Sequence, residues 1–160
     1  MKINFNKSRQ ILEIEDCRII YRNFAGIEGK FNREGDRSFS IIIPNQEIAD
    51  QLIEKGWNVK IKPPREEGEE PFMTLKVKIK FSGRGPSAYV ISGKNHRRLN
   101  EETIGILDEM DIQSVNLDLR PYDWEVNGKT GRTAYLNAIE VIQNIDRFGA
   151  KYETEDDLPF

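Results

Sequence analysis

Lysine residues alternate with apolar residues in the stretch "TLKVKIKF" (residues 74–81). In an extended strand, Lys76, Lys78 and Lys80 point to one face, and the apolar side chains between them point to the other. Neighbouring ammonium groups on that face lie about 6.5–7 Å apart, which is close to the spacing of successive phosphates along a nucleic-acid strand. The pattern therefore predicts phosphate binding, with a solvated strand face or a protected sheet edge as the alternative.

Further cations follow the same pattern or lie in nearby loops. The stretch "WNVKIK" repeats the alternation with Lys60 and Lys62, so five lysines share one sheet face if the two strands are neighbours. The stretches "SGRGPS" and "SGKNHRRLN" read as loops, and their glycines would allow a ligand to approach the backbone closely. Their candidate phosphate-binding cations are Arg84, Lys94, Arg97 and Arg98. Such residues are also common in ordinary loops, and that alternative stays open.

Aromatic residues are interleaved with cations in "LRPYDWEVNGKTGRTAY". In a strand, Arg120, Tyr122 and Trp124 share one face, and the hairpin tip adds Lys129 and Arg132. A single-stranded nucleic acid suits such a surface, because each stacked base contributes about 1–3 kcal/mol and cations follow the phosphates. The two rings could instead pack in the core or against the hairpin.

The sequence gives little support to catalysis. The acidic residues of "LDEMD" (Asp108, Glu109 and Asp111) could hold a nuclease metal, but acids at a helix end are usually solvated. One histidine, His96, and one cysteine, Cys17, are too few for a structural zinc site, and no GxxxxGK[ST] phosphate loop is present. We expect a non-enzymatic protein without a cofactor or a bound metal. The single cysteine also excludes an internal disulfide and fits a reducing compartment.

Short alternating segments separated by turn residues predict the elements that position these groups. We expect about seven strands, a helix in "PNQEIADQLIEKG" that begins at Asn45, and a second helix in "NEETIGILDEMD" that begins at Asn100. The Asn-Gly pair in "NGKTG" predicts a hairpin. The chain is thus predicted to be mostly β or α+β, as an OB-like five-stranded Greek-key barrel with extra hairpins and two short helices. A β-sandwich is the alternative.

The predicted domain covers residues 1–150, and residues 151–160 form a flexible acidic tail. Four of the chain's 27 acidic residues lie in the last eight residues, "ETEDDLPF", which contain no lysine or arginine. The chain has a net charge of −3, so the residues before this stretch carry a net charge of +1. Such asymmetry predicts a separate role for the tail, and the apolar residues at its tip predict that the tail binds a partner protein.

The tip "DDLPF" resembles the C-terminal tip of bacterial single-stranded DNA-binding proteins, in which an acidic run precedes an aliphatic residue, a proline and a final phenylalanine. The stretch "RNFAGIEGKFNREGDRSFSIII" resembles a segment of phage proteins of this type, several of which join an OB body to an acidic tail that ends in an aromatic residue. The resemblance implies a tip that docks on proteins of DNA replication, recombination and repair. The residues that would dock are Asp156, Asp157, Leu158, Pro159 and Phe160.

Together these patterns predict a phage-encoded, sequence-independent single-stranded DNA-binding protein in the cytoplasm of a bacterial host. It would protect unpaired DNA and recruit partners through its tail. A protein–protein adaptor or inhibitor without a DNA role is the alternative, and a metal-dependent nuclease is the third possibility. No apolar run reaches the ~18 residues of a membrane span, so no membrane partner is expected. The body departs from the bacterial family, which leaves homo-oligomer formation open.

Overall fold

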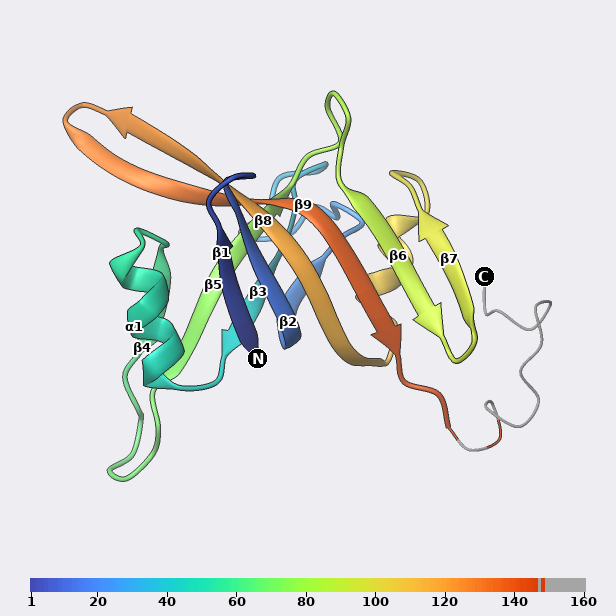
Figure 1. Ribbon diagram of the computed structural model, residues 1–160, viewed down its shortest axis with the longest axis horizontal. Coiled ribbons are helices and arrows are strands. Elements are labelled where there is room, and N and C mark those ends of the chain that lie inside the picture. The colour runs from blue at the N-terminus through green and yellow to red at the C-terminus, as the bar shows by residue number, and fades with distance from the viewer. Residues whose placement is uncertain (147, 149–160) are drawn as a thin grey trace.

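The computed structural model describes residues 1–146 and 148, and strands dominate this part of the chain (Figure 1). The predicted tail residues 151–160, with the five proposed docking residues, lie outside the described residues. The elements are β1 (Lys2–Asn6), β2 (Ile11–Asn23), β3 (Arg37–Ile43), α1 (Gln46–Glu54), β4 (Val59–Lys62), β5 (Phe72–Ile79), β6 (Ser87–Ser92), β7 (Asn95–Leu99), the 3-10 helix η1 (Ile104–Asp108), β8 (Ile112–Val126) and β9 (Lys129–Gln143).

Five strands close into a barrel in the order β5-β3-β2-β8-β9, and β9 returns to pair with β5. The β5–β9 pairing is parallel, and the other pairings of the ring are antiparallel. If the five strands are numbered along the chain, they follow the ring 1-2-3-5-4-1, which is the Greek-key order of an OB barrel. The predicted fold class is confirmed, and the sandwich alternative is wrong.

Strand β2 takes part in two regions of the ring because it bends. Its first half pairs with β1 and β8, and its second half pairs with β3. The register shifts once between Ile14 and Cys17 and again between Ile20 and Asn23. Asp16 and Tyr21, within these shifts, have φ values of 54° and 56°, as expected where β-bulges bend a strand. The backbone runs through both bulges as one continuous strand.

The core fills the barrel with the inward faces of these strands. The apolar residues between the lysines of β5 are all buried, as the alternation predicts. Phe24 and Phe39 are buried and stacked, with ring centroids 5.0 Å apart. Trp57 is 5% exposed, so this ring packs in the core and is not available to a ligand.

The remaining elements extend the barrel. Helix α1 begins after Asn45, whose side chain accepts a hydrogen bond from the backbone N–H of Ile48, as predicted. The β8–β9 hairpin projects beyond the barrel as an arm, and the β6–β7 hairpin lies on the opposite side, next to β9 (Figure 1). No helix in the described part of the chain is long and apolar enough to cross a membrane.

Two local expectations differ from the structure. The predicted basic loop that carries Lys94, Arg97 and Arg98 is a tight hairpin, because its second half pairs with β6 as strand β7. The predicted second helix is only the five-residue 3-10 helix η1. Asn100 still caps the preceding turn, where its side chain accepts hydrogen bonds from Glu102 and Thr103.

Candidate nucleic-acid interface

A row of polar and aromatic side chains crosses four strands on the outer face of the barrel. Ser38 of β3 lies opposite Lys78 of β5, Lys78 lies opposite Tyr135 of β9, and Tyr135 lies opposite Arg120 of β8. Directly paired residues project from the same side of a sheet. The row therefore brings a lysine, a tyrosine and an arginine from distant parts of the chain onto one surface.

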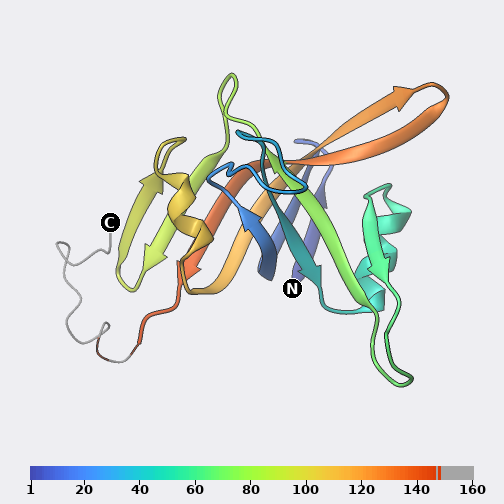
Figure 2. The same ribbon diagram turned by 180° about the vertical axis from the view of Figure 1, so that it is seen from behind.

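This surface forms one wall of a groove of about 430 Å³. The other wall is the β2–β3 loop, residues 24–36, which lies beside one end of β5 when the molecule is seen from behind (Figure 2). The charged lining residues are the cations Arg33, Arg37, Lys76, Lys78 and Lys80 and the carboxylates Asp36 and Glu101. The groove is open and positively charged, which suits an extended polyanion better than a compact small molecule.

The Tyr135 ring lies close to two cations, Lys80 and Arg120. The Nζ of Lys80 lies 5.2 Å from the centre of the Tyr135 ring, and the guanidinium carbon of Arg120 lies 5.4 Å from it. A cation over an aromatic face gains about 0.5–1 kcal/mol at an exposed site. Tyr135 thereby concentrates positive charge at the junction of β5, β8 and β9.

Two aromatic rings of the arm are open to solvent, so the proposed core role for them is wrong. Tyr122 is 58% exposed and meets Tyr135 edge-on, with ring centroids 6.1 Å apart. Trp124 is 38% exposed, and its ring lies against Gly131 of β9, where any Cβ atom would overlap it. Because glycine has no side chain, the indole packs directly against the backbone of Gly131 on the neighbouring strand.

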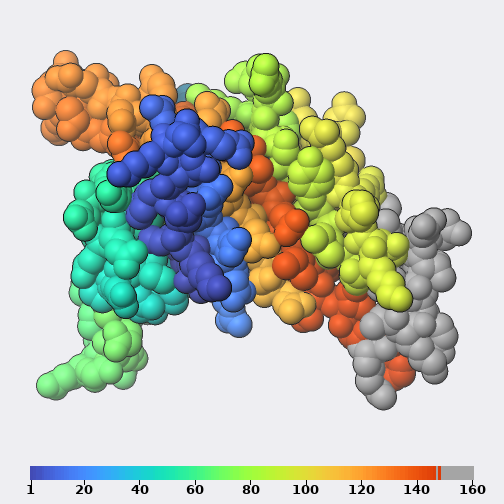
Figure 3. All heavy atoms as spheres, viewed as in Figure 1, coloured from blue at the N-terminus to red at the C-terminus, as the bar shows by residue number. Residues whose placement is uncertain are grey.

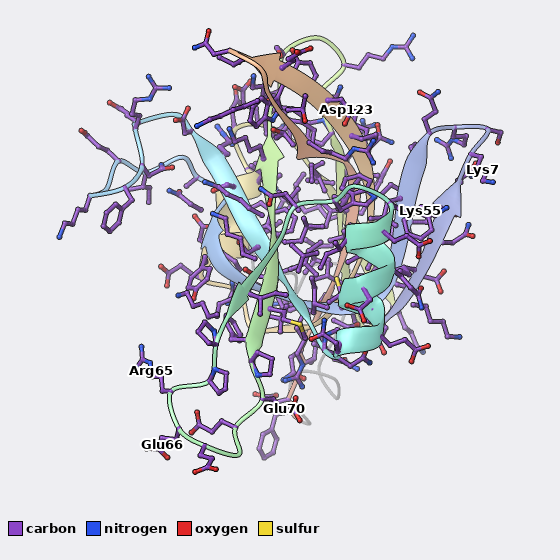
Figure 4. The ribbon with its side chains drawn as sticks, turned by 90° about the vertical axis from the view of Figure 1, so that its left-hand side faces the viewer. Lys7, Lys55, Arg65, Glu66, Glu70 and Asp123 are labelled. Atoms are coloured by element: carbon purple, nitrogen blue, oxygen red, sulfur yellow. The ribbon has the colours of Figure 1, made fainter. Side chains whose placement is uncertain are left out.

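Arg132, which the sequence predicted to contact DNA, makes several structural contacts in the arm. Its guanidinium binds both carboxylate oxygens of Asp123, at 2.6 and 3.1 Å, and donates to the carbonyl oxygen of Lys55 at 2.6 Å. It also lies over the Trp57 ring. Figure 4 shows Asp123 on the arm above Lys55, which follows α1. Arg132 thus links the arm to the end of helix α1. Its hydrogen bonds to Asp123 lower the pKa of that carboxyl group.

The other predicted cations are divided between this surface and the rest of the molecule. Lys60 pairs with Thr74, and β4 is the neighbour of β5, so Lys60 and Lys62 project from the same side of the sheet as the lysines of β5. Arg84 is exposed in the loop that leaves the groove after Ser82, and Lys129 lies at the tip of the arm.

The β6–β7 cations lie apart from the groove. Arg98 stands over Tyr89, 5.9 Å from its ring centre. Tyr89 lines a different concave surface of about 650 Å³ on the opposite face, between β1 and β6 (Figure 3). Four carboxylates line that surface, on Glu13, Glu15, Asp118 and Glu140. Burial and the charge of Glu13, its cross-strand neighbour, raise the pKa of Asp118. Lys94, Arg97 and Arg98 line neither surface, and their contact with DNA remains a prediction.

The acidic stretch around η1 is structural. The carboxylate of Asp108 accepts hydrogen bonds from the backbone N–H groups of Phe24 and Ala25, at 2.6 and 3.1 Å. Asp111 accepts a hydrogen bond from the Asn144 side chain. Within residues 1–146 and 148, no cluster of three potential ligands could hold a metal ion. The nuclease hypothesis therefore lacks its proposed site.

Several residues of the surface were not predicted. Tyr135, Arg37, Phe31 and Phe81 all line the groove. Arg37 donates to the carbonyl oxygens of Phe24 and Glu101 and lies 5.1 Å from the Phe81 ring centre. Only Phe31 carried a visible signal, because a phenylalanine within the polar loop sequence "GKFNREG" has no apolar neighbour to pack against.

A family model and solved structures match this chain. The family model described as "Putative phage ssDNA-binding domain" matches residues 3–160. The chain is similar in structure to the single-stranded DNA-binding protein from bacteriophage Enc34, with a TM-score of 0.55 and 16% identity over 98% of both chains. It is also similar to that protein in complex with ssDNA, with a TM-score of 0.52 and 17% identity over 92% of this chain and 93% of the other. No curated protein matches the chain in sequence. At these identities, the structural similarities establish the fold alone.

Proposed function

The chain belongs to the phage ssDNA-binding domain family, and we propose that it binds single-stranded DNA, without sequence preference, along the groove between the β2–β3 loop and β5. The observation that carries this proposal is the row Lys78, Tyr135 and Arg120, which places cations and aromatic rings on one outer face. The chemistry required for unpaired DNA is this combination of phosphate-binding cations and stacking platforms.

The phosphates would lie along the lysines of β5. Lys76 and Lys78 are exposed, and each lies opposite a small serine of β3, Ser40 or Ser38. Lys80 and Arg120, held by Tyr135, extend this positive track toward the arm.

The bases would stack on the arm. Tyr122 meets Tyr135 with its planes nearly perpendicular, at 85°, which leaves a face of the exposed Tyr122 ring free for a base. Trp124 packs against Gly131 and remains 38% exposed, so part of its indole is accessible to a base. A stacked base is recognised by its face and not by its edge, so this mode discriminates little between sequences. A duplex hides these faces, which gives the preference for single strands.

By coating single strands, the protein would protect them during DNA replication, recombination and repair in the bacterial cytoplasm. The test is digestion of circular single-stranded phage DNA with a single-strand-specific nuclease, at increasing protein concentration. We expect protection that saturates at a fixed number of nucleotides per protein molecule. A duplex carrying a short gap serves as the control, and only its gap should be protected. Cleavage at an unchanged rate under saturating protein would contradict the proposal.

We also propose that the acidic tip recruits partner proteins. The terminal Phe160 ring would enter an apolar pocket of the partner, its carboxylate would meet a cation, and Asp156 and Asp157 would steer the encounter. The support is the sequence of the tip and its concentrated charge.

Removal of Phe160 alone should abolish the binding of replication or recombination proteins and leave DNA affinity unchanged, because it removes the apolar anchor but keeps the acidic run. Removal of "DDLPF" should also abolish partner binding. It should leave DNA affinity equal or raise it, because a tethered polyanion competes with phosphate for the lysines. Pull-down of host proteins and oligo-dT titration measure the two effects. Loss of DNA binding by either variant would show that the tip belongs to the DNA-binding body.

A further inference from the structure

The loop between β2 and β3 presents an exposed aromatic ring to the groove. Phe31 is 92% exposed and lines the groove together with Lys76, Lys78 and Tyr135. Its nearest cation contact is Lys30, whose Nζ lies 5.5 Å from the ring centre. Full exposure of a phenylalanine costs the hydrophobic free energy that burial would gain, about 1.5–3 kcal/mol. No packing role in the described structure offsets this cost.

The loop is fixed by its own polar side chains. The amide nitrogen of Asn32 donates to the carbonyl oxygens of Ile27, Arg33 and Asp36 at 2.9–3.0 Å. The side chain of Asn23 accepts from the N–H of Ile27 and donates to the carbonyl of the same residue. Phe31 is therefore carried by a structured loop, next to the residue that organises it.

The base of the loop is fixed as well. Asp108 binds the N–H groups of Phe24 and Ala25, and Arg37 binds the carbonyl oxygen of Phe24. At Gly26, φ is +71°, and a Cβ atom would lie 3.1 Å from the backbone of Gly35. The two ends of the loop therefore approach each other closely at this glycine, and this close approach fixes the base of the loop.

We propose that Phe31 is a base-stacking residue on the loop side of the groove, and that Asn32 is the positioning residue that presents it. This inference rests on the proposed function and adds a second stacking site, across the lysine row from the arm. A nucleotide in the groove would place its phosphate on the β5 lysines and its base on the Phe31 ring. Because the ring is already held in place, little conformational entropy is lost when the base stacks.

The test compares two probes of equal length, oligo-dT and an abasic oligonucleotide that keeps only the sugar–phosphate chain. Phe31→Ala should weaken oligo-dT binding about 5- to 150-fold, the range expected for one lost stacked base. Binding of the abasic probe and the salt dependence of both affinities should be unchanged, since no charge is altered. Tyr89→Ala is the matched control, because Tyr89 is also a partly exposed aromatic residue (38%) but lines the acidic face. It should bind both probes like the unchanged protein.

The role of Asn32 is tested with Asn32→Leu, which keeps the approximate size of the side chain and removes its hydrogen bonds without adding charge. It should weaken oligo-dT binding in the same direction as Phe31→Ala. In a chain that already carries Phe31→Ala it should have little further effect, because Asn32 acts through Phe31. A purely structural role would give the same loss in both backgrounds and would remove Asn32 from the proposal.

The outcomes also separate this inference from the proposed function. If the unchanged protein binds oligo-dT and Phe31→Ala binds it equally well, Phe31 is not a stacking residue. Equal losses on oligo-dT and on the abasic probe would also overturn the stacking role. If the substitution converts a dimer to a monomer and leaves DNA affinity intact, the loop is a protein interface instead. Failure of the unchanged protein to bind oligo-dT would overturn the proposed function itself.

Discussion

Replacement of Lys76, Lys78 and Lys80 together by serine is expected to weaken single-stranded DNA binding about 100-fold in 0.1 M salt. Each phosphate contact to a single strand contributes about 0.7 to the slope of log K against log salt, so three lost contacts should flatten the slope by about 2. The affinity gap should narrow as the salt concentration rises and should close near 1 M. All base sequences should be affected alike, because phosphates carry no sequence information.

The matched control removes the same charge from another part of the molecule. Lys2, Lys7 and Arg9 are exposed on the β1–β2 hairpin, and Figure 4 shows Lys7 across the barrel from the β2–β3 loop. Their replacement by serine should change DNA affinity only slightly, through the overall charge of the protein. Thermal unfolding should show that both triple variants remain folded. Equal loss of affinity in the two variants would mean that charge, and not the groove, determines binding.

The alternation of lysines was sufficient to predict strand β5 and its outward-facing lysines. A period of two can place three lysines outside a barrel only if the apolar residues between them point inward, and these residues are buried in the structure. The shared face of the β4 and β5 lysines also followed from the pattern, on the single condition that the two strands are neighbours. Register makes such predictions strong wherever one face of a sheet is buried.

Contacts between distant segments were not predictable in the same way. Arg132 looked like one more cation at a hairpin tip, but its partners come from two separate segments: Asp123 from β8, and the carbonyl of Lys55 and the Trp57 ring from the segment after α1. Tyr135 seemed an ordinary strand residue until the parallel β5–β9 pairing placed it between Lys78 and Arg120. No local pattern in the sequence specifies that pairing.

The cations of "GKNHRRLN" also depend on contacts between distant segments for their placement. Their density resembled that of a phosphate-binding loop, but they lie on a hairpin that pairs with β9 beyond the end of β5, and none of them lines the groove. The neighbouring surface carries four carboxylates, and the sheet brings the two of β2 together with one each from β8 and β9. Cations therefore predominate in the lining of the groove and carboxylates in the lining of this second surface, although the body is nearly neutral.

The central claim is that the groove and the arm together recognise unpaired DNA. The most direct measurement is a fluorescence-anisotropy titration of the full chain with oligo-dT and with a duplex of the same length, at two salt concentrations. If four cations meet phosphates, log K for oligo-dT should fall against log salt with a slope near −3. Two stacked bases at about 1–3 kcal/mol each should make oligo-dT binding at least about 30-fold tighter than duplex binding. Equal affinity for single strands and duplex, or a slope near zero, would contradict the account.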